Sequence, residues 1–217
     1  MILVEAAVET LESALAAERG GANRIELCAD LSVGGTTPDR ELIAAVAERT
    51  RIPLFVMIRP RGGGFVYSGY EIDTMSRDIE LAANIGIAGI VTGALTPHGQ
   101  LHAEHTRSLL NAAGGLPVTF HRAFDVVPEP LTALERLIDL DVSRVLTSGG
   151  AATAAEGADA IAALVDRTRG RLAIIAGGGI REHNARDVIA RTGVGEIHTR
   201  FIDEASLRDL VDLVTRG

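Results

Sequence analysis

The stretch Val118-Thr-Phe-His-Arg-Ala-Phe-Asp125 decides how this sequence is interpreted, because a short apolar run ends there in residues able to carry chemistry. Two other stretches have the same form, Arg24-Ile-Glu-Leu-Cys28 and Val56-Met-Ile-Arg-Pro-Arg61. In a parallel barrel each strand crosses the core and delivers its last residues to one shared rim. The repetition therefore predicts a pocket built at the carboxyl ends of parallel strands.

Segments typical of strands and of helices alternate along the chain at intervals of about 25 residues, as in repeated βα units. Strands are expected at Ile2–Val8, Arg24–Cys28, Leu54–Pro60, Gly89–Gly93, Val118–Ala123, Arg144–Ser148, Leu172–Ala176 and Glu196–Arg200. Helices are expected at Leu11–Arg19, Glu41–Arg49, Met75–Ala83, Thr106–Ala113, Leu131–Leu140, Ala158–Arg167, Asn184–Arg191 and Leu207–Val214. This pattern predicts one α/β domain over residues 1–217, a (β/α)8 TIM barrel. A doubly wound sheet is the alternative, and it would need fewer strands or a switch in strand order.

Composition excludes several classes of function. The net charge of −8 argues against nucleic acid as a partner, since binding to phosphates needs a basic surface. All 21 basic residues are arginine, so no lysine is present to form a Schiff base, to hold pyridoxal phosphate or to complete a P-loop. A single cysteine rules out an intrachain disulfide and fits a reducing compartment.

The hydropathy pattern predicts a cytoplasmic protein. No apolar run reaches the roughly 18 residues that a membrane span needs. The first residues, Met1-Ile-Leu-Val-Glu5, lack the basic flank of a signal peptide and are expected to form a strand. We therefore expect no membrane partner.

Alternation along the predicted strands indicates which side chains face the barrel lumen. It places five reactive side chains there, those of Glu26, Cys28, Arg59, His121 and His198. Charges inside a barrel must pair, because an isolated buried charge is very costly. For Glu5 and Glu196, early in their strands, an internal ion-pair network and a functional role are equally open. For Glu26, Arg59 and His121, near the rim, we favour a functional role.

The residue types near the rim suggest acid–base chemistry on an anion. His121 would exchange a proton near neutral pH, with Glu26 or Asp125 as its partner. Arg59 and Arg61 would clamp a carboxylate or phosphate through their planar donor groups. A glycine run after the seventh strand, Gly177, Gly178 and Gly179, would let backbone N–H groups approach an anion, where barrels often bind phosphate. Cys28 and Met57 are soft sulfur ligands suited to Cu(I), although packing alone also explains them.

The motifs together resemble the CutC family of copper homeostasis proteins. The similarity runs from Met1 to about His198. It includes Gly20-Gly-Ala-Asn-Arg-Ile-Glu-Leu-Cys28, Gly34-Gly-Thr-Thr-Pro38, Val56-Met-Ile-Arg-Pro-Arg61, Gly93-Ala-Leu95, Val118-Thr-Phe-His-Arg-Ala-Phe-Asp125 and Leu146-Thr-Ser-Gly149. The resemblance implies a TIM barrel, cytoplasmic copper handling, Cu(I) ligation by Cys28 and a homo-oligomer. Two hypotheses remain. One is a Cu(I)-binding protein that uses Cys28 with Met57 or a second subunit. The other is a lyase, isomerase or hydrolase acting on a small anionic metabolite.

Overall fold

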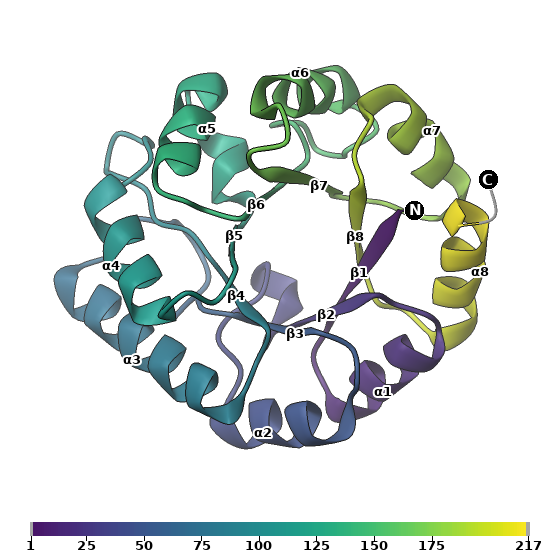
Figure 1. Ribbon diagram of the computed structural model, residues 1–217, viewed down its shortest axis with the longest axis horizontal. Coiled ribbons are helices and arrows are strands. Elements are labelled where there is room, and N and C mark those ends of the chain that lie inside the picture. The colour runs from purple at the N-terminus through teal and green to yellow at the C-terminus, as the bar shows by residue number, and fades with distance from the viewer. Residues whose placement is uncertain (1, 216–217) are drawn as a thin grey trace.

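In the computed structural model, which describes residues 2–215, each strand pairs in parallel with its neighbour in the sequence, and the last strand closes on the first (Figure 1). The strands are β1 (Leu3–Val8), β2 (Arg24–Leu27), β3 (Leu54–Met57), β4 (Gly89–Thr92), β5 (Val118–Phe120), β6 (Arg144–Thr147), β7 (Ala173–Gly177) and β8 (Glu196–Arg200). The α-helices are α1 (Leu11–Arg19), α2 (Arg40–Arg49), α3 (Gly69–Ile85), α4 (Ala103–Ala113), α5 (Pro130–Asp139), α6 (Ala158–Thr168), α7 (Glu182–Thr192) and α8 (Glu204–Thr215). They surround the strands, so the predicted (β/α)8 TIM barrel is confirmed.

Local sequence explains where several helices begin. Asp39 caps α2 by accepting the N–H of Leu42, and Ser68 forms a capping box with Glu71 at the start of α3. The expected third helix began at Met75, whereas α3 begins at Gly69. Its first turn is missed because Gly69 and Tyr70 are poor helix formers, although the Ser68–Glu71 pair is a recognisable starting signal.

The strands end earlier than expected at two points that shape the rim. β3 ends at Met57 rather than Pro60, and β5 ends at Phe120 rather than Ala123. After β5, the His121 ring nitrogen Nδ1 accepts the N–H of Ala123, and a short 3₁₀ helix, η2 (Arg122–Val126), follows. A second 3₁₀ helix, η1 (Leu31–Val33), lies in the loop after β2. His121 thus turns the chain at the end of its strand.

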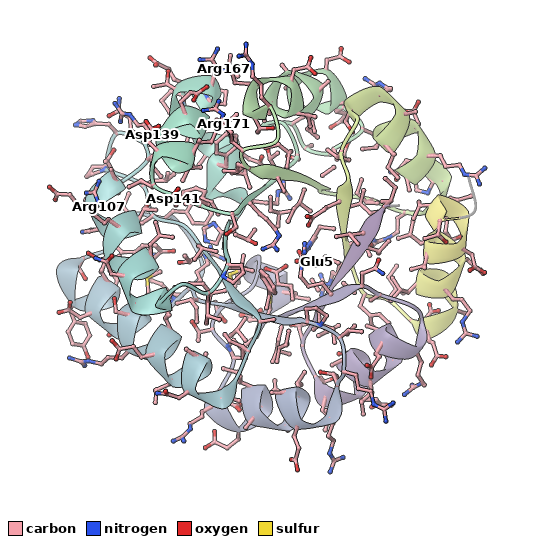
Figure 2. The ribbon with its side chains drawn as sticks, in the orientation of Figure 1. Glu5, Arg107, Asp139, Asp141, Arg167 and Arg171 are labelled. Atoms are coloured by element: carbon pink, nitrogen blue, oxygen red, sulfur yellow. The ribbon has the colours of Figure 1, made fainter. Side chains whose placement is uncertain are left out.

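The barrel has two kinds of interior. Apolar side chains pack between the strands and the ring of helices, among them Ile25, Val56 and Ile90. The lumen carries charge, and Figure 2 shows Glu5 in the middle of the barrel, whereas Arg167 and Arg171 lie at its outer edge. Within the described residues, no helix is long and apolar enough to cross a bilayer.

The amino-terminal part of the lumen holds an ion-pair network. Arg24, the first residue of β2, donates hydrogen bonds to Glu5 and to Glu196 at 2.5 Å each. Arg144, the first residue of β6, lies 3.6 Å from Glu196, and the Arg24 and Arg144 guanidinium groups both lie over the Phe55 ring. Opposite charges thus neutralise one another in this layer, which confirms the network as one role of Glu5 and Glu196.

Candidate functional site

A cavity of about 300 Å³ opens at the carboxyl ends of the strands, above the ion-pair network. Its wall includes all five side chains that the alternation placed in the lumen, together with Met57. The residues that line it are Ala7, Glu26, Cys28, Leu31, Val33, Gly34, Met57, Arg59, Phe65, His121, Arg122, Leu146, Gly178, Gly179, Arg181, His198 and Arg200. The predicted location of the pocket is therefore confirmed.

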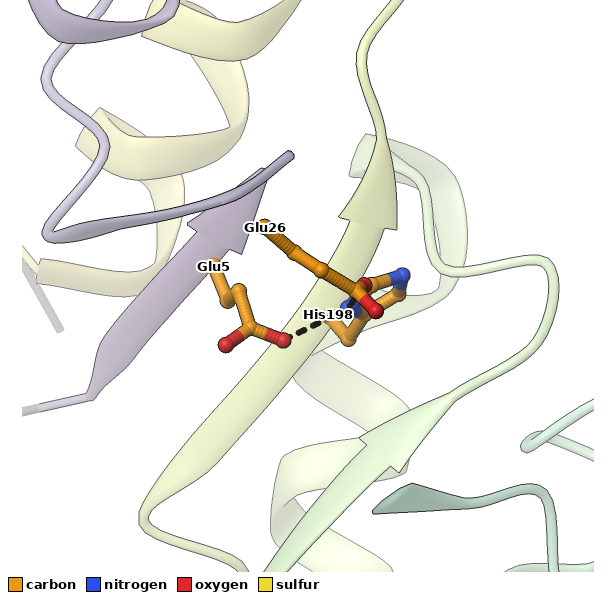
Figure 3. Close-up of side chains that lie close together, drawn as sticks. All are labelled: Glu5, Glu26 and His198. Atoms are coloured by element: carbon orange, nitrogen blue, oxygen red, sulfur yellow. Dashed lines mark hydrogen bonds and ion pairs between the residues drawn. The ribbon is translucent and has the colours of Figure 1, made fainter. Parts of the chain in front are cut away.

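Two carboxyl groups share one histidine at the floor of this cavity (Figure 3). Nδ1 of His198, on β8, lies 2.8 Å from Oε1 of Glu5 on β1 and 3.3 Å from Oε2 of Glu26 on β2. Strand register explains the meeting, because Glu5 pairs with His198 and Ala7 with Glu26 across adjacent strands. The second oxygen of Glu26, Oε1, is buried and has no hydrogen-bond partner among residues 2–215.

The two carboxyl groups differ in their affinity for a proton. Burial raises the pKa of Glu5, but hydrogen bonds and the charges of His198 and Arg24 outweigh burial and lower this pKa to about 2. Burial raises the pKa of Glu26 to about 7, because the opposing His198 charge is not enough to compensate. Burial lowers the pKa of His198, yet the carboxylates of Glu26 and Glu5 raise it overall. Glu5 is thus a fixed anion, Glu26 has a pKa near neutral pH, and the protonated form of His198 is favoured by its two carboxylate neighbours.

The same three side chains have the composition of a metal site, since their ligand atoms lie within 4.8 Å of one another. Their hydrogen bonds argue for a different use. Nδ1 of His198 is already bonded to Glu5, and Glu5 also accepts a hydrogen bond from Arg24. A cation held by Nδ1 of His198 would displace the hydrogen bond to Glu5, so the bonds made by this nitrogen are those of a proton-sharing cluster.

The two sulfur side chains lie together on one wall. Cys28 and Met57 belong to a small apolar cluster with Phe55 and Val91, and a Cβ atom at Gly35 would lie 3.1 Å from the Cys28 sulfur and 3.4 Å from the Met57 methyl carbon. Burial and the negative charge of Glu26 raise the pKa of the Cys28 thiol well above its usual value. The structure therefore places both sulfur atoms where a soft ion could enter, but it disfavours the thiolate that binds Cu(I).

The two arginines expected to clamp an anion have different partners. Arg59 lines the cavity, but Nη1 donates to the carbonyls of Val33 and Gly35, and Nη2 to that of Gly63. Arg61 lies outside the cavity wall and forms an ion pair with Glu71 at 2.6 Å. Arg59 thus fixes the loops after β2 and β3 while its charge remains beside the cavity, and the structure does not place Arg61 in the site.

His121 lines the cavity in a form that differs from the expectation. Because Nδ1 accepts the Ala123 N–H, the proton of the neutral ring is on Nε2. Burial, and then the charge of Arg59, lower the pKa of His121 to about 3. This environment keeps the ring neutral, so the expected proton exchange near pH 7 is not favoured here.

Asp125 has no direct contact with His121. Its carboxylate accepts hydrogen bonds from the Thr147 hydroxyl, the Ser148 N–H and Arg122. It therefore joins η2 to the end of β6 and lies outside the cavity wall. The side-chain hydrogen bonds of Asp125 thus go to β6 and Arg122 rather than to His121, because the 3₁₀ turn redirects the chain, although the charge of Asp125 acts to raise the pKa of His121.

A basic rim surrounds the cavity mouth. Arg122, Arg181 and Arg200 line it, and so do Gly178 and Gly179, which have φ values of 106° and 73°. Gly177 instead ends β7, where a Cβ atom would lie 3.2 Å from Cβ of His198. Arg181 and Arg200 were not among the predicted site residues. A signal for each was present, since Arg181 follows the glycine run after β7 and Arg200 is the last residue of β8. Two glycines and three arginines therefore provide the positive surface expected for an anion.

A parallel barrel with an acid–base cluster and a basic rim at the carboxyl ends of its strands is a TIM-barrel protein with a ligand site of the usual location. This class is as far as the fold and the site lead by themselves.

The chain belongs to the CutC family, since the family model described as "CutC family" matches residues 2–203. It is 48% identical over 196 residues to the human "Copper homeostasis protein cutC homolog", covering 90% of this chain and 72% of that protein. It is 50% identical over 195 residues to a CutC family protein of Xanthomonas axonopodis pv. citri, covering 90% and 81% of the two chains. The crystal structure of a CutC protein from Streptococcus agalactiae superposes with a TM-score of 0.88 at 36% identity, over 93% of this chain and all of that one.

Proposed function

We propose that this CutC family protein is an enzyme that transfers protons to and from a small anionic metabolite, as a lyase, isomerase or hydrolase. One observation carries the proposal. The carboxyl group of Glu26 is buried in the cavity wall, has a pKa raised to about 7 and lies 3.3 Å from His198. A group whose pKa lies near the working pH is suited to act as a general acid or base.

The surroundings of Glu26 fit this role. Glu5 accepts a hydrogen bond from His198 and keeps its own negative charge, so it orients the imidazole and stabilises its protonated form. The cavity volume of about 300 Å³ suits a small metabolite rather than a polymer. At the mouth, Arg122, Arg181 and Arg200 would hold a phosphate or carboxylate, with Gly178 and Gly179 letting it approach the backbone.

The test is a ligand screen followed by a single substitution. Purified protein is screened for an increase in melting temperature with small phosphorylated and carboxylated metabolites, and each stabilising compound is assayed for turnover. We expect Glu26→Gln to bind the compound and to lower kcat by about 100-fold or more. Asp78→Asn is the control, since Asp78 is an acidic residue of α3 outside the cavity wall. A screen in which no anion stabilises the protein, or full activity of Glu26→Gln, would contradict the proposal.

Binding of Cu(I) is the second candidate, favoured by the shared wall of Cys28 and Met57 and by the names of the relatives. Titration of the reduced protein with Cu(I) against a chelator tests it. One-to-one binding that is lost in Cys28→Ser and weakened in Met57→Leu would support copper as cargo. Met75→Leu is the matched control, because Met75 is buried in the helix layer away from the cavity. The cytoplasmic location and the homo-oligomer stay predictions.

A further inference from the structure

The hydrogen-bond donor Nε2–H of His121 is buried in the cavity wall without an acceptor among the residues that the structure describes. The residue as a whole is 3% exposed. A buried N–H group without a partner is costly, by about 1–3 kcal/mol, and such groups are rare in folded proteins. A group of this kind that lines a cavity is completed when a ligand supplies the missing acceptor.

The His121 ring is held in place from several sides. A Cβ atom at Gly93 would lie 2.8 Å from the ring, so the glycine lets the imidazole pack closely on the chain directly after β4. The Phe65 ring lies over it with a centroid separation of 5.0 Å, and the Phe120 ring contacts its edge. With Nδ1 bonded to Ala123, the ring has little freedom to turn, so the direction of Nε2–H is preorganised.

The charge of Arg59 lies beside this donor. The Arg59 guanidinium and the His121 ring both contact Phe65, and the Arg59 charge lowers the pKa of His121. The same charge favours negative charge on any oxygen that accepts from Nε2–H. Its terminal nitrogens are bonded to loop carbonyls, whereas its buried Nε–H has no acceptor among residues 2–215. Arg59 therefore contributes its charge and leaves a second donor unused beside His121.

We propose that Nε2–H of His121 donates a hydrogen bond to a carbonyl oxygen of the substrate, across the cavity from Glu26 and His198. The proposal rests on the proposed function and names its substrate class, a small anionic carbonyl compound. β5 and β2 lie on different sides of the barrel, so a small molecule would fit between His121 and Glu26.

This arrangement suits isomerisation through an enolate. The Glu26 carboxylate would take a proton from the carbon next to the carbonyl, and the C–H electron pair would form a C=C bond. The carbonyl π electrons would move to oxygen, where the neutral imidazole donates without losing its proton. The substrate for this step carries a hydroxyl group on the carbon that loses its proton. Glu26 returns that proton to the former carbonyl carbon, and the hydroxyl proton passes to the former carbonyl oxygen as the hydroxyl carbon becomes the new carbonyl. Atoms and electrons then balance without a co-reactant.

Two substitutions separate the donor from the structural role of the ring. His121→Asn places an amide oxygen near the position of Nδ1, so it keeps an acceptor for Ala123 but loses the cavity donor. His121→Gln places its amide N–H near the position of Nε2 and gives up the Nδ1 acceptor. A structural role predicts that Gln is the more damaging change, whereas a ligand-binding role predicts that Asn is.

The probe is 2-phosphoglycolate, whose planar carboxylate resembles an enolate, and ethyl phosphate is the control that lacks those oxygens. Calorimetric titration of the parent should show tighter binding of phosphoglycolate. His121→Asn should weaken this binding by about tenfold or more, as expected for a hydrogen bond to a charged group. It should leave ethyl phosphate unchanged, and His121→Gln should retain most of the affinity for phosphoglycolate.

Each other result has a defined meaning. Equal binding of both probes by the parent and by His121→Asn overturns the oxygen contact but leaves the anion site standing. Failure of both probes to bind the parent counts against the proposed function itself. Nitrogen NMR of labelled histidine tests the donor without any probe, because the proposal requires His121 to carry its proton on Nε2. A proton on Nδ1 overturns the proposal.

Discussion

The lumen of this barrel contains two polar layers that are built on opposite principles. The layer near the amino ends of the strands joins Arg24, Glu5, Glu196 and Arg144 in one network of opposite charges, closed by the face of Phe55. The layer near the carboxyl ends contains polar atoms with no hydrogen-bond partner within residues 2–215, Oε1 of Glu26 and Nε2 of His121. In the first layer both carboxylates have arginine partners, and the atom left without a partner among the described residues, Nη1 of Arg144, lies away from the cavity wall. In the second layer the atoms without partners belong to residues that line the cavity, where a ligand can supply the missing hydrogen bonds.

Glu5 connects the two layers. One of its oxygens accepts a hydrogen bond from Arg24 in the lower layer, and the other is bonded to His198 in the upper layer. The lower layer therefore fixes the charge and position of the group that orients His198. The comparison teaches that burial of charge alone does not identify a site in this barrel. What distinguishes the site is unused hydrogen-bonding capacity on residues that line a cavity.

The largest expected effect comes from breaking the paired layer. Arg24→Met removes a cation whose side chain is 7% exposed and leaves the carboxylates of Glu5 and Glu196 buried without their partner. Breaking a buried pair in this way costs about 3–5 kcal/mol of unfolding free energy, and methionine preserves most of the side-chain volume. Urea denaturation measures the loss.

Arg167→Met is the matched control for that experiment. Arg167 also bonds to a carboxylate, Glu135, but its side chain is 55% exposed at the outer edge of the barrel (Figure 2). An exposed pair contributes about 0–1 kcal/mol. Similar losses of unfolding free energy in Arg24→Met and Arg167→Met would show that the buried ion pairs of the lower layer stabilise the protein no more than an exposed pair does.

A smaller effect is expected from Glu26→Gln in the upper layer, and it depends on pH. The pKa of Glu26 is about 7 in the folded protein, against an ordinary value of 4.5. The folded protein holds this proton more tightly than the unfolded chain does, so protonated Glu26 contributes to the free energy of unfolding. This contribution is fully present below pH 4.5 and is lost as pH rises through 7. The raised pKa of His198 acts in the same direction at higher pH.

The amide cannot ionise, so Glu26→Gln escapes this loss. Relative to the parent, the variant should gain on the order of 1 kcal/mol or more of unfolding free energy between pH 5 and pH 8. Urea denaturation of both proteins at the two pH values measures the difference. The quantity to compare is the unfolding free energy of the variant minus that of the parent at each pH. If this difference is the same at pH 5 and pH 8, or larger at pH 5, burial does not hold Glu26 in its protonated form.

The contrast between the layers also shows how far the sequence could lead. Alternation placed Glu26, Cys28 and His198 in the lumen correctly, because these residues lie within or directly after regular strands. The same alternation put Arg61 on the face of Arg59, but β3 ends at Met57 and the loop no longer alternates. Asp125, predicted as a partner of His121, forms its hydrogen bonds with β6 and Arg122 instead, since η2 redirects the chain after His121.

The protonation of the site residues could not be predicted from the chain order. The pKa values of Glu26 and His121 shift in opposite directions from ordinary ones because of burial and of charges supplied by other strands. The tautomer of His121 depends on one hydrogen bond to Ala123 that exists only once the strand has ended. The sequence therefore indicated where the site lies. Three-dimensional contacts determine which residue transfers a proton and which donates a hydrogen bond while keeping its proton.

The smallest expected effect is at the basic rim, where Arg200→Gln sharpens the assignment of the upper layer to an anion. Arg200 lines the cavity mouth with a side chain that is 55% exposed, 3.6 Å from Glu9. Its loss should weaken binding of 2-phosphoglycolate by about threefold, and less at high salt, because exposed charges are screened. Arg208→Gln is the control, with the same exposure of 55% on α8 but with Glu204 as partner. Calorimetric titration with 2-phosphoglycolate at two salt concentrations measures the effect. Equal affinities of Arg200→Gln and Arg208→Gln would show that the anion does not bind at the basic rim.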